Sequence, residues 1–174
     1  MSEIRKIVVI GPESTGKSTL SEQLAGALHT VWVPEYARGY LENLGRGYAE
    51  PDLLEMAKGQ LASENELLKQ ANQYLICDTD LYVLKVWSEA KYERCHSWIL
   101  EQIAHRQYDL YLLTNIDFPW QDDVQREHGK PEERTYFYNI YRDIVMQSGV
   151  LWIEVSGDEK TRLGLAIAAV HKLL

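Results

Sequence analysis

Cysteine is scarce in this sequence of 174 residues, which contains only Cys77 and Cys95. The two thiols form no C-x-x-C pair and no spacing typical of a disulfide framework. A small secreted fold held by disulfides is therefore disfavoured, and a cytoplasmic location with reduced thiols is the simpler expectation. The first strand candidate begins within a few residues of Met1, so we also expect no signal peptide.

Long apolar runs and excess positive charge are absent as well. No apolar stretch approaches the roughly 20 residues that a membrane-spanning helix needs. The formal net charge is −8, which disfavours a nonspecific binder of nucleic acid or of anionic membranes, because either would need a basic face. We therefore expect a small-molecule ligand, whose phosphates would be bound locally by a loop and a few arginines. Nothing in the sequence indicates an oligomeric state.

What the sequence does contain is typical of an ordinary globular domain. Hydrophobic residues make up 45% of the chain and charged residues 25%. This length favours one domain with a sizeable core, and no repeat or low-complexity linker divides the chain. We predict a single domain over residues 1–174.

Short apolar runs alternate with helical patterns along the whole chain. Near-continuous apolar runs are typical of strands in a parallel sheet that is covered on both faces. The expected strands are residues 4–10, 30–34, 74–77, 110–114 and 150–155. The expected helices are residues 17–29, 51–72, 81–92, 97–106, 132–147 and 159–174. This alternation predicts an α/β fold, with three α/β/α layers, a five-stranded parallel sheet and right-handed crossovers.

A glycine-bounded loop follows the first expected strand and matches the pattern G-x-x-x-x-G-K-[ST]. Gly11 and Gly16 let successive backbone N–H groups turn inward around phosphate oxygens. The next helix adds unpaired N–H groups and the positive end of its dipole. Lys17 can reach the β- and γ-phosphates, and the Ser18 hydroxyl can ligate Mg²⁺. The loop therefore predicts a site for the phosphates of a nucleoside triphosphate.

The residues that follow the expected strands form five clusters. They are residues 11–19, 35–38, 78–80, 115–126 and 156–157. In an open α/β sheet, ligands bind outside the carboxyl ends of the strands, so we expect these clusters to converge on one cleft. Four of the clusters carry groups suited to phosphoryl transfer.

Acidic residues follow the second and third expected strands. Asp78 can hold Mg²⁺ together with Ser18, or it can act as a base. Asp80 fits either a helix cap or a contact to a substrate hydroxyl. Glu35 can accept the proton of an attacking hydroxyl, and Arg38 can brace the charge that develops during transfer. The sequence leaves open whether Glu35 or Asp78 is the base.

The segment after the fourth expected strand is polar and charged, and several of its side chains can bind a ligand. Trp120 can stack on a planar ring, including a cationic one. Asp122 or Asp123 can bond ribose hydroxyls, and Arg126 can close over the triphosphate when the segment shuts. We predict a lid and substrate segment over residues 117–135. The alternative is a polar surface loop with one half-buried tryptophan.

Four motifs follow one another along the chain. They are Gly-Pro-Glu-Ser-Thr-Gly-Lys-Ser-Thr-Leu (11–20), Glu-Tyr-Ala-Arg (35–38), Asp-Thr-Asp (78–80) and Pro-Trp-x-Asp-Asp-x-x-Arg (119–126). Together they resemble the nicotinamide riboside kinase domain of NadR-type proteins, over nearly the whole chain. The resemblance implies a P-loop NTPase fold of the deoxynucleoside-kinase kind. It also implies Mg²⁺- and ATP-dependent transfer of the γ-phosphate to the 5′-hydroxyl of nicotinamide riboside, a step of NAD salvage.

The residue patterns and this resemblance together predict roles for particular residues. ATP would be held by Gly11, Glu13, Ser14, Thr15, Gly16, Lys17, Ser18 and Thr19, with Mg²⁺ on Ser18 and Asp78. Catalytic roles are expected for Lys17, Glu35, Asp78 and Arg126. Substrate contacts are expected from Glu35, Tyr36, Arg38, Asp80, Trp120, Asp122 and Asp123. The alternatives are a kinase for another nucleoside or small hydroxyl metabolite, and a regulatory P-loop ATPase. Adenylylation and transcriptional regulation, which other domains of such proteins perform, are not carried over.

Overall fold

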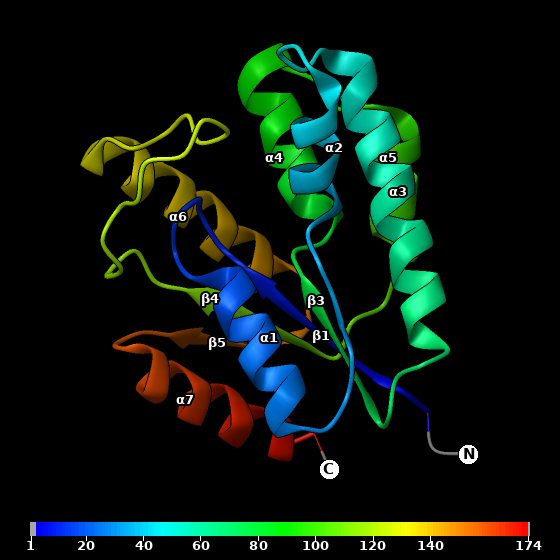
Figure 1. Ribbon diagram of the computed structural model, residues 1–174, viewed down its shortest axis with the longest axis vertical. Helices are drawn as coiled ribbons and strands as arrows, with labels where there is room; N and C mark the ends of the chain where they lie inside the picture. Colours follow the sequence, from blue (N-terminus) through cyan, green and yellow to red (C-terminus); the bar gives the residue numbers. More distant parts are fainter. Residues whose placement is uncertain (1–2, 174) are drawn as a thin grey trace.

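The computed structural model describes residues 3–173 and contains a parallel sheet of five strands (Figure 1). The strands are β1 (Arg5–Ile10), β2 (Trp32–Val33), β3 (Tyr74–Asp78), β4 (Leu110–Thr114) and β5 (Leu151–Val155). The helices are α1 (Lys17–Ala27), α2 (Tyr36–Leu44), α3 (Glu50–Leu68), α4 (Leu81–Tyr92), α5 (Ser97–His105), α6 (Pro131–Gln147) and α7 (Glu159–His171). The predicted α/β fold is confirmed.

Strand β1 lies at the centre of the sheet, whose order is β2-β3-β1-β4-β5. It pairs with β3, where Val9 is opposite Asp78, and with β4, where Ile10 is opposite Leu113. Residues 7–10 of β1 are fully buried because helices cover both faces of the sheet. This register brings the loop after β1 next to the carboxyl ends of β3 and β4.

Helices α1 and α7 cover one face of the sheet, whereas α6 and part of α4 cover the other (Figure 1). Leu20 and Leu24 of α1 pack with Val170 of α7 on the first face. Val83 of α4 packs with Val145 of α6 on the second. The predicted three-layer arrangement is therefore confirmed.

Helices α2, α3, α4 and α5 gather into a separate group beside the sheet (Figure 1). Met56 and Leu81 are buried at its centre. Helix α2 was not predicted from the sequence. It spans nine residues and contains Gly39, which weakens a helix. It ends at Leu44, and Gly45 follows in the left-handed conformation at φ 68°. Packing against α3 stabilises it despite this weak local signal.

Element boundaries differ from the predicted ones by a few residues. Strand β2 has two residues instead of five, and β3 includes Asp78 itself. Helix α7 ends at His171, three residues before the predicted end at 174, which lies outside the described residues. Residues 117–130 of the predicted lid and substrate segment are irregular, whereas residues 131–135 form the first turn of α6. Within residues 3–173, no helix is both long and apolar enough to cross a membrane.

Candidate functional site

The loop after β1 is fastened to the end of β4. Gly11 has φ 154°, and a Cβ at this position would lie 2.2 Å from the Thr114 side-chain oxygen, so only glycine fits. The hydroxyls of Thr15 and Thr114 lie 2.7 Å apart, and the Thr15 hydroxyl donates to the Pro12 carbonyl at 2.8 Å. These bonds hold the loop in an open curve, ready to receive phosphate oxygens.

The two polar side chains at the start of α1 already have partners. Lys17 Nζ donates to the Pro12 carbonyl at 2.7 Å, and Ser18 Oγ donates to Asp78 Oδ2 at 2.5 Å. Asp78 is 1% exposed, and within residues 3–173 its Oδ1 atom has no hydrogen-bond partner. A buried carboxylate oxygen without a partner, next to a hydroxyl oxygen, fits a hard cation such as Mg²⁺.

Phosphate oxygens and water would have to complete this coordination. Among the described residues, no group of three or more His, Cys, Asp and Glu side chains could hold a metal ion. Magnesium keeps several waters and binds through one or two carboxylates plus substrate phosphates. The donor set of Ser18 and Asp78 therefore suits a magnesium that arrives with a nucleotide.

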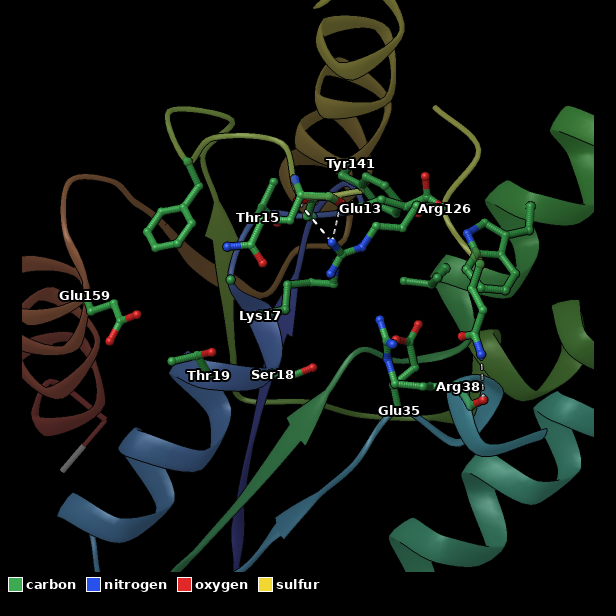
Figure 2. Close-up of a pocket in the computed structure, with 18 residues that line it drawn as sticks. Glu13, Thr15, Lys17, Ser18, Thr19, Glu35, Arg38, Arg126, Tyr141 and Glu159 are labelled. Atoms are coloured by element: carbon green, nitrogen blue, oxygen red, sulfur yellow. Dashed lines mark hydrogen bonds between the residues drawn. The ribbon is translucent and has the colours of Figure 1, made fainter. Parts of the chain in front are cut away.

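A cavity of about 200 Å³ opens in front of the loop (Figure 2). The predicted residues that line it are Gly11, Glu13, Ser14, Thr15, Gly16, Lys17, Ser18, Thr19, Glu35, Arg38 and Arg126. In Figure 2, Glu35 and Arg38 lie across the cavity from Lys17. Of the five clusters expected to converge, 11–19, 35–38 and 115–126 contribute to this lining, and Asp78 of the 78–80 cluster bonds to Ser18 behind it. Residues 156–157 do not line the cavity.

Glu35 is the titratable group best placed for proton transfer in this cavity. It is half-buried at the start of α2. Burial, together with the negative charge of the nearby Asp78, raises the pKa of Glu35 to about 7, although Lys17 and Arg38 oppose the shift. Burial also raises the pKa of Asp78, against the lowering effects of Lys17 and of the Ser18 hydrogen bond. Because one Asp78 oxygen is occupied by Ser18, Glu35 fits the role of base better.

The irregular segment before α6 is hydrogen-bonded to the phosphate loop. Glu13 Oε2 accepts the backbone N–H groups of Glu127 and His128, each at 3.1 Å. Ser14 Oγ accepts the backbone N–H of Gln121 at 2.8 Å and a guanidinium N–H of Arg126 at 3.3 Å. Arg126 is thereby held over the loop, and Figure 2 shows it beside Lys17.

A second set of bonds ties this segment to α2. Arg38 forms an ion pair with Asp123 at 3.0 Å, and the Gln125 side-chain amide donates to the Arg38 carbonyl at 3.3 Å. The Gln125 backbone N–H and Arg38 together lower the pKa of Asp123. In this conformation Asp123 therefore tethers the segment, instead of facing the cavity as the ribose contact that the sequence predicts.

Two predicted substrate contacts lie beside the cavity and outside its lining. The Trp120 indole N–H donates to Asp122 at 2.8 Å, and the Arg134 guanidinium lies 5.9 Å from the Trp120 ring centre. Gly129 also packs against the indole. Trp120 and Asp122 thus satisfy each other locally, so the predicted stacking surface does not face the cavity.

The structure favours the capping alternative for Asp80. Its Oδ1 accepts the Tyr82 backbone N–H at 2.9 Å, and its Oδ2 accepts the Tyr111 hydroxyl at 2.7 Å. Burial raises the pKa of Asp80 to about 7. Tyr36, another predicted substrate contact, packs over Gly59 outside the lining of the cavity.

Several residues at the site carry no signal in the sequence. Arg162 of α7 is 2% exposed and donates to the Thr15, Gly157 and Asn115 carbonyls. It also pairs with Asp117, and its guanidinium lies 4.4 Å from the Phe118 ring centre. Arg162 therefore ties the phosphate loop to the segments after β4 and β5. An arginine on a terminal amphipathic helix is ordinarily exposed, which is why sequence reasoning missed it.

Phe118, Trp87 and Tyr141 also line the cavity without having been predicted. They come from the segment after β4, from α4 and from α6 respectively. Aromatic residues at helical spacing are ordinarily core residues, so no local pattern separates those that face a cavity.

A glycine-bounded phosphate cradle at the end of the central strand of a parallel sheet defines a P-loop nucleotide-binding domain. A family model described as "AAA domain" matches residues 6–162, and the chain belongs to this family.

Curated relatives with similar sequences are trifunctional NAD biosynthesis/regulator proteins named NadR. The protein from Escherichia coli K12 is 27% identical over 163 residues, which cover 90% of this chain and 39% of the relative. The protein from Salmonella typhimurium LT2 is 27% identical, with 87% of this chain and 38% of the relative covered. The expected similarity to NadR-type proteins is confirmed, and the chain spans about two fifths of these relatives' length.

Solved structures agree with the fold. A crystal structure of NadR in complex with NR has a TM-score of 0.79 and 26% identity, and the match covers 98% of this chain and 49% of that chain. A deoxyadenosine kinase from M. mycoides with bound dATP has a TM-score of 0.62 at 18% identity, covering 96% of this chain and 99% of that chain. This second likeness concerns the fold alone.

Proposed function

We propose that this chain, acting as a single domain, is a kinase that uses ATP and Mg²⁺ to phosphorylate the 5′-hydroxyl of nicotinamide riboside, giving nicotinamide mononucleotide. One observation carries the proposal: a half-buried carboxylate, Glu35, lies across one cavity from Lys17 and Ser18 of a phosphate loop. The similarity to a NadR structure that holds NR supports the choice of acceptor.

The donor side of the site would bind the triphosphate. Backbone N–H groups of residues 13–19 would surround its oxygens, and Lys17 would turn from the Pro12 carbonyl to the β- and γ-phosphates. Ser18 and Asp78 would hold Mg²⁺, which when bound neutralises charge on the β- and γ-oxygens. Arg126, held by Ser14 and Gln121, is close enough to the loop to add a further positive charge.

The acceptor side would activate the hydroxyl. Glu35 would take the proton of the 5′-hydroxyl while that oxygen attacks the γ-phosphorus. The bond from the γ-phosphorus to the β–γ bridging oxygen breaks, and ADP leaves with its electron pair. Glu35 then passes the proton to solvent. Its raised pKa, about 7, matches a base that works near neutral pH.

A panel of acceptors tests this function. The enzyme, Mg²⁺ and ATP are mixed with nicotinamide riboside, uridine, cytidine or adenosine, and both ADP and the phosphorylated acceptor are measured. The proposal predicts stoichiometric ADP and nicotinamide mononucleotide. ADP formed at the same rate without any acceptor would support a regulatory P-loop ATPase instead.

A kinase for another nucleoside is the second candidate. The specific observation in its favour is that Trp120 and Asp122 bond to each other and do not line the cavity. The riboside contacts that the sequence predicts are therefore not provided by these two residues in this conformation. Turnover of uridine or cytidine at the rate of nicotinamide riboside would favour this candidate.

A further inference from the structure

The side chains at the end of β3 do not follow the alternation of the strand. Ile76 packs with α1 on one face of the sheet, whereas Cys77 packs with α6 on the other. Successive side chains of a strand point to opposite faces. A regular continuation of β3 would therefore place residues 78 and 80 together on the α1 face.

Asp78 and Asp80 instead serve opposite faces of the sheet. Asp78 bonds Ser18 at the start of α1, as the alternation predicts. Asp80 accepts the hydroxyl of Tyr111 at 2.7 Å, and Tyr111 belongs to the core on the α6 face. The Tyr82 backbone N–H also donates to Asp80, at 2.9 Å. Asp80 is thus anchored to two elements, β4 and α4.

Thr79 supplies the turn between the two carboxylates. It is buried and has φ 70°, in the left-handed region, which is an outlier for a β-branched residue. Such a conformation persists only when the surrounding structure fixes it. On one side, the Thr79 N–H donates to the Val9 carbonyl of β1 at 3.0 Å. On the other side, the anchored Asp80 provides the restraint.

We propose that the hydrogen bond from Tyr111 to Asp80 positions Asp78 for its metal ion. It does so by holding the turn at Thr79. This inference rests on the proposed function, in which Asp78 and Ser18 bind Mg²⁺. Asp78 Oδ1 has no hydrogen-bond partner among the described residues, so its direction depends on the backbone that carries it. Without the Tyr111 anchor, Thr79 relaxes toward negative φ and turns Asp78 away from Ser18.

Asp80 and Tyr111 are therefore positioning residues, and neither lines the phosphate cavity. Equilibrium binding without turnover tests this role. Calorimetry measures the Kd of a nonhydrolysable ATP analogue with Mg²⁺ and, in the presence of EDTA, without it. We call the Kd without Mg²⁺ divided by the Kd with Mg²⁺ the magnesium ratio. It reports the contribution of the metal and cancels changes in the phosphate loop itself.

Tyr111→Phe removes only the hydroxyl and should lower the magnesium ratio, with the Kd in EDTA unchanged. A hydrogen bond to a charged group changes an equilibrium by about 10- to 100-fold. Only part of this effect reaches Asp78 through the turn, so we expect the ratio to fall by at least about 3-fold. An undiminished ratio in Tyr111→Phe would overturn the positioning role.

Tyr108→Phe is the matched control. Tyr108 contacts Tyr111 edge to face, and its hydroxyl donates to the buried Glu64 at 2.9 Å. This variant also loses a hydrogen bond to a buried carboxylate, so urea unfolding should show both Phe variants folded and destabilised. Glu64 lies on α3 and does not adjoin Thr79 in the chain, so the magnesium ratio should equal that of the wild type. Equal losses in the two Phe variants would overturn the proposal.

Asp80→Asn separates positioning from charge. The amide oxygen still accepts the Tyr82 N–H, and the amide nitrogen can donate to the Tyr111 oxygen, so both anchors survive without the negative charge. We expect a magnesium ratio near that of the wild type for Asp80→Asn and a reduced one for Asp80→Ala. A reduced ratio in Asp80→Asn would assign the effect to charge and overturn the positioning role. A wild-type ratio of one would instead refute the metal site of the proposed function.

Discussion

Replacing Glu35 by glutamine separates its catalytic role from its cost to stability. The amide keeps the size of the carboxyl group and cannot accept the proton of the acceptor hydroxyl. General base catalysis typically contributes about 10²- to 10⁴-fold, so we expect kcat at pH 8 to fall by that factor. For the wild type, the pKa of about 7 predicts that kcat/KM rises with pH and levels off above that value.

The same substitution should stabilise the protein at alkaline pH. The pKa of Glu35 is raised from 4.5 to about 7, so the native state binds the proton more tightly than the unfolded state. The resulting stability is fully present below pH 4.5 and is lost as the pH rises to about 7. At about 1.4 kcal/mol per pH unit, this loss is at most about 3 kcal/mol at pH 8. Glutamine avoids it, which corresponds to a rise of about 6–12 °C in Tm.

Thermal and urea unfolding at pH 4 and pH 8 measure this effect. Glu35→Gln and wild type should differ at pH 8 and converge at pH 4. Glu42→Gln, an exposed change on the same helix, serves as the control and should shift Tm at neither pH. Equal stability of Glu35→Gln and wild type at pH 8 would show that the carboxyl group is not desolvated. Retained turnover would show that it is not the base.

Other substitutions probe the phosphate loop. Lys17→Ala should abolish phosphoryl transfer in the coupled ADP assay, whereas the exposed Lys69→Ala should not, and near wild-type turnover of Lys17→Ala would mean that the loop does not hold the γ-phosphate. Gly11→Ala should lower the free energy of urea unfolding by about 1–3 kcal/mol, because its Cβ meets the Thr114 hydroxyl; an unchanged midpoint would contradict this close contact. Arg162→Ala should cost about 3–5 kcal/mol and raise the KM for ATP, since it leaves the Thr15 and Gly157 carbonyls without their buried partner. Wild-type values for both would show that Arg162 does not position the loop.

The fold and the phosphate loop could be predicted because their signals are local. Residues 7–10 form a continuous apolar run that only a covered central strand explains, and the glycine pattern follows it directly. Convergence of the strand ends then follows from sheet topology. Helix α2 was missed because its signal is weak: it is short, contains Gly39 and owes its stability to packing against α3.

The parts that could not be predicted depend on side-chain contacts, which neither periodicity nor a short motif reports. The sequence predicted that Trp120 would face a ligand, but its indole is bonded to Asp122, only two residues away. Tyr48 and Trp87 are separated by 39 positions, and only the packing of α4 beside the α2–α3 connection stacks them. Arg162 lies 147 positions from Thr15, whose carbonyl it bonds, and no periodicity reports such a contact.

The most direct test of the kinase account follows the migrating phosphoryl group itself. ATP labelled with ¹⁸O at the γ-phosphate is incubated with the enzyme, Mg²⁺ and nicotinamide riboside. The products are then separated, and mass spectrometry measures which of them carries the label. The account predicts that the labelled phosphoryl group appears in nicotinamide mononucleotide, at the 5′-oxygen. Label found in inorganic phosphate, with the riboside unmodified, would contradict it.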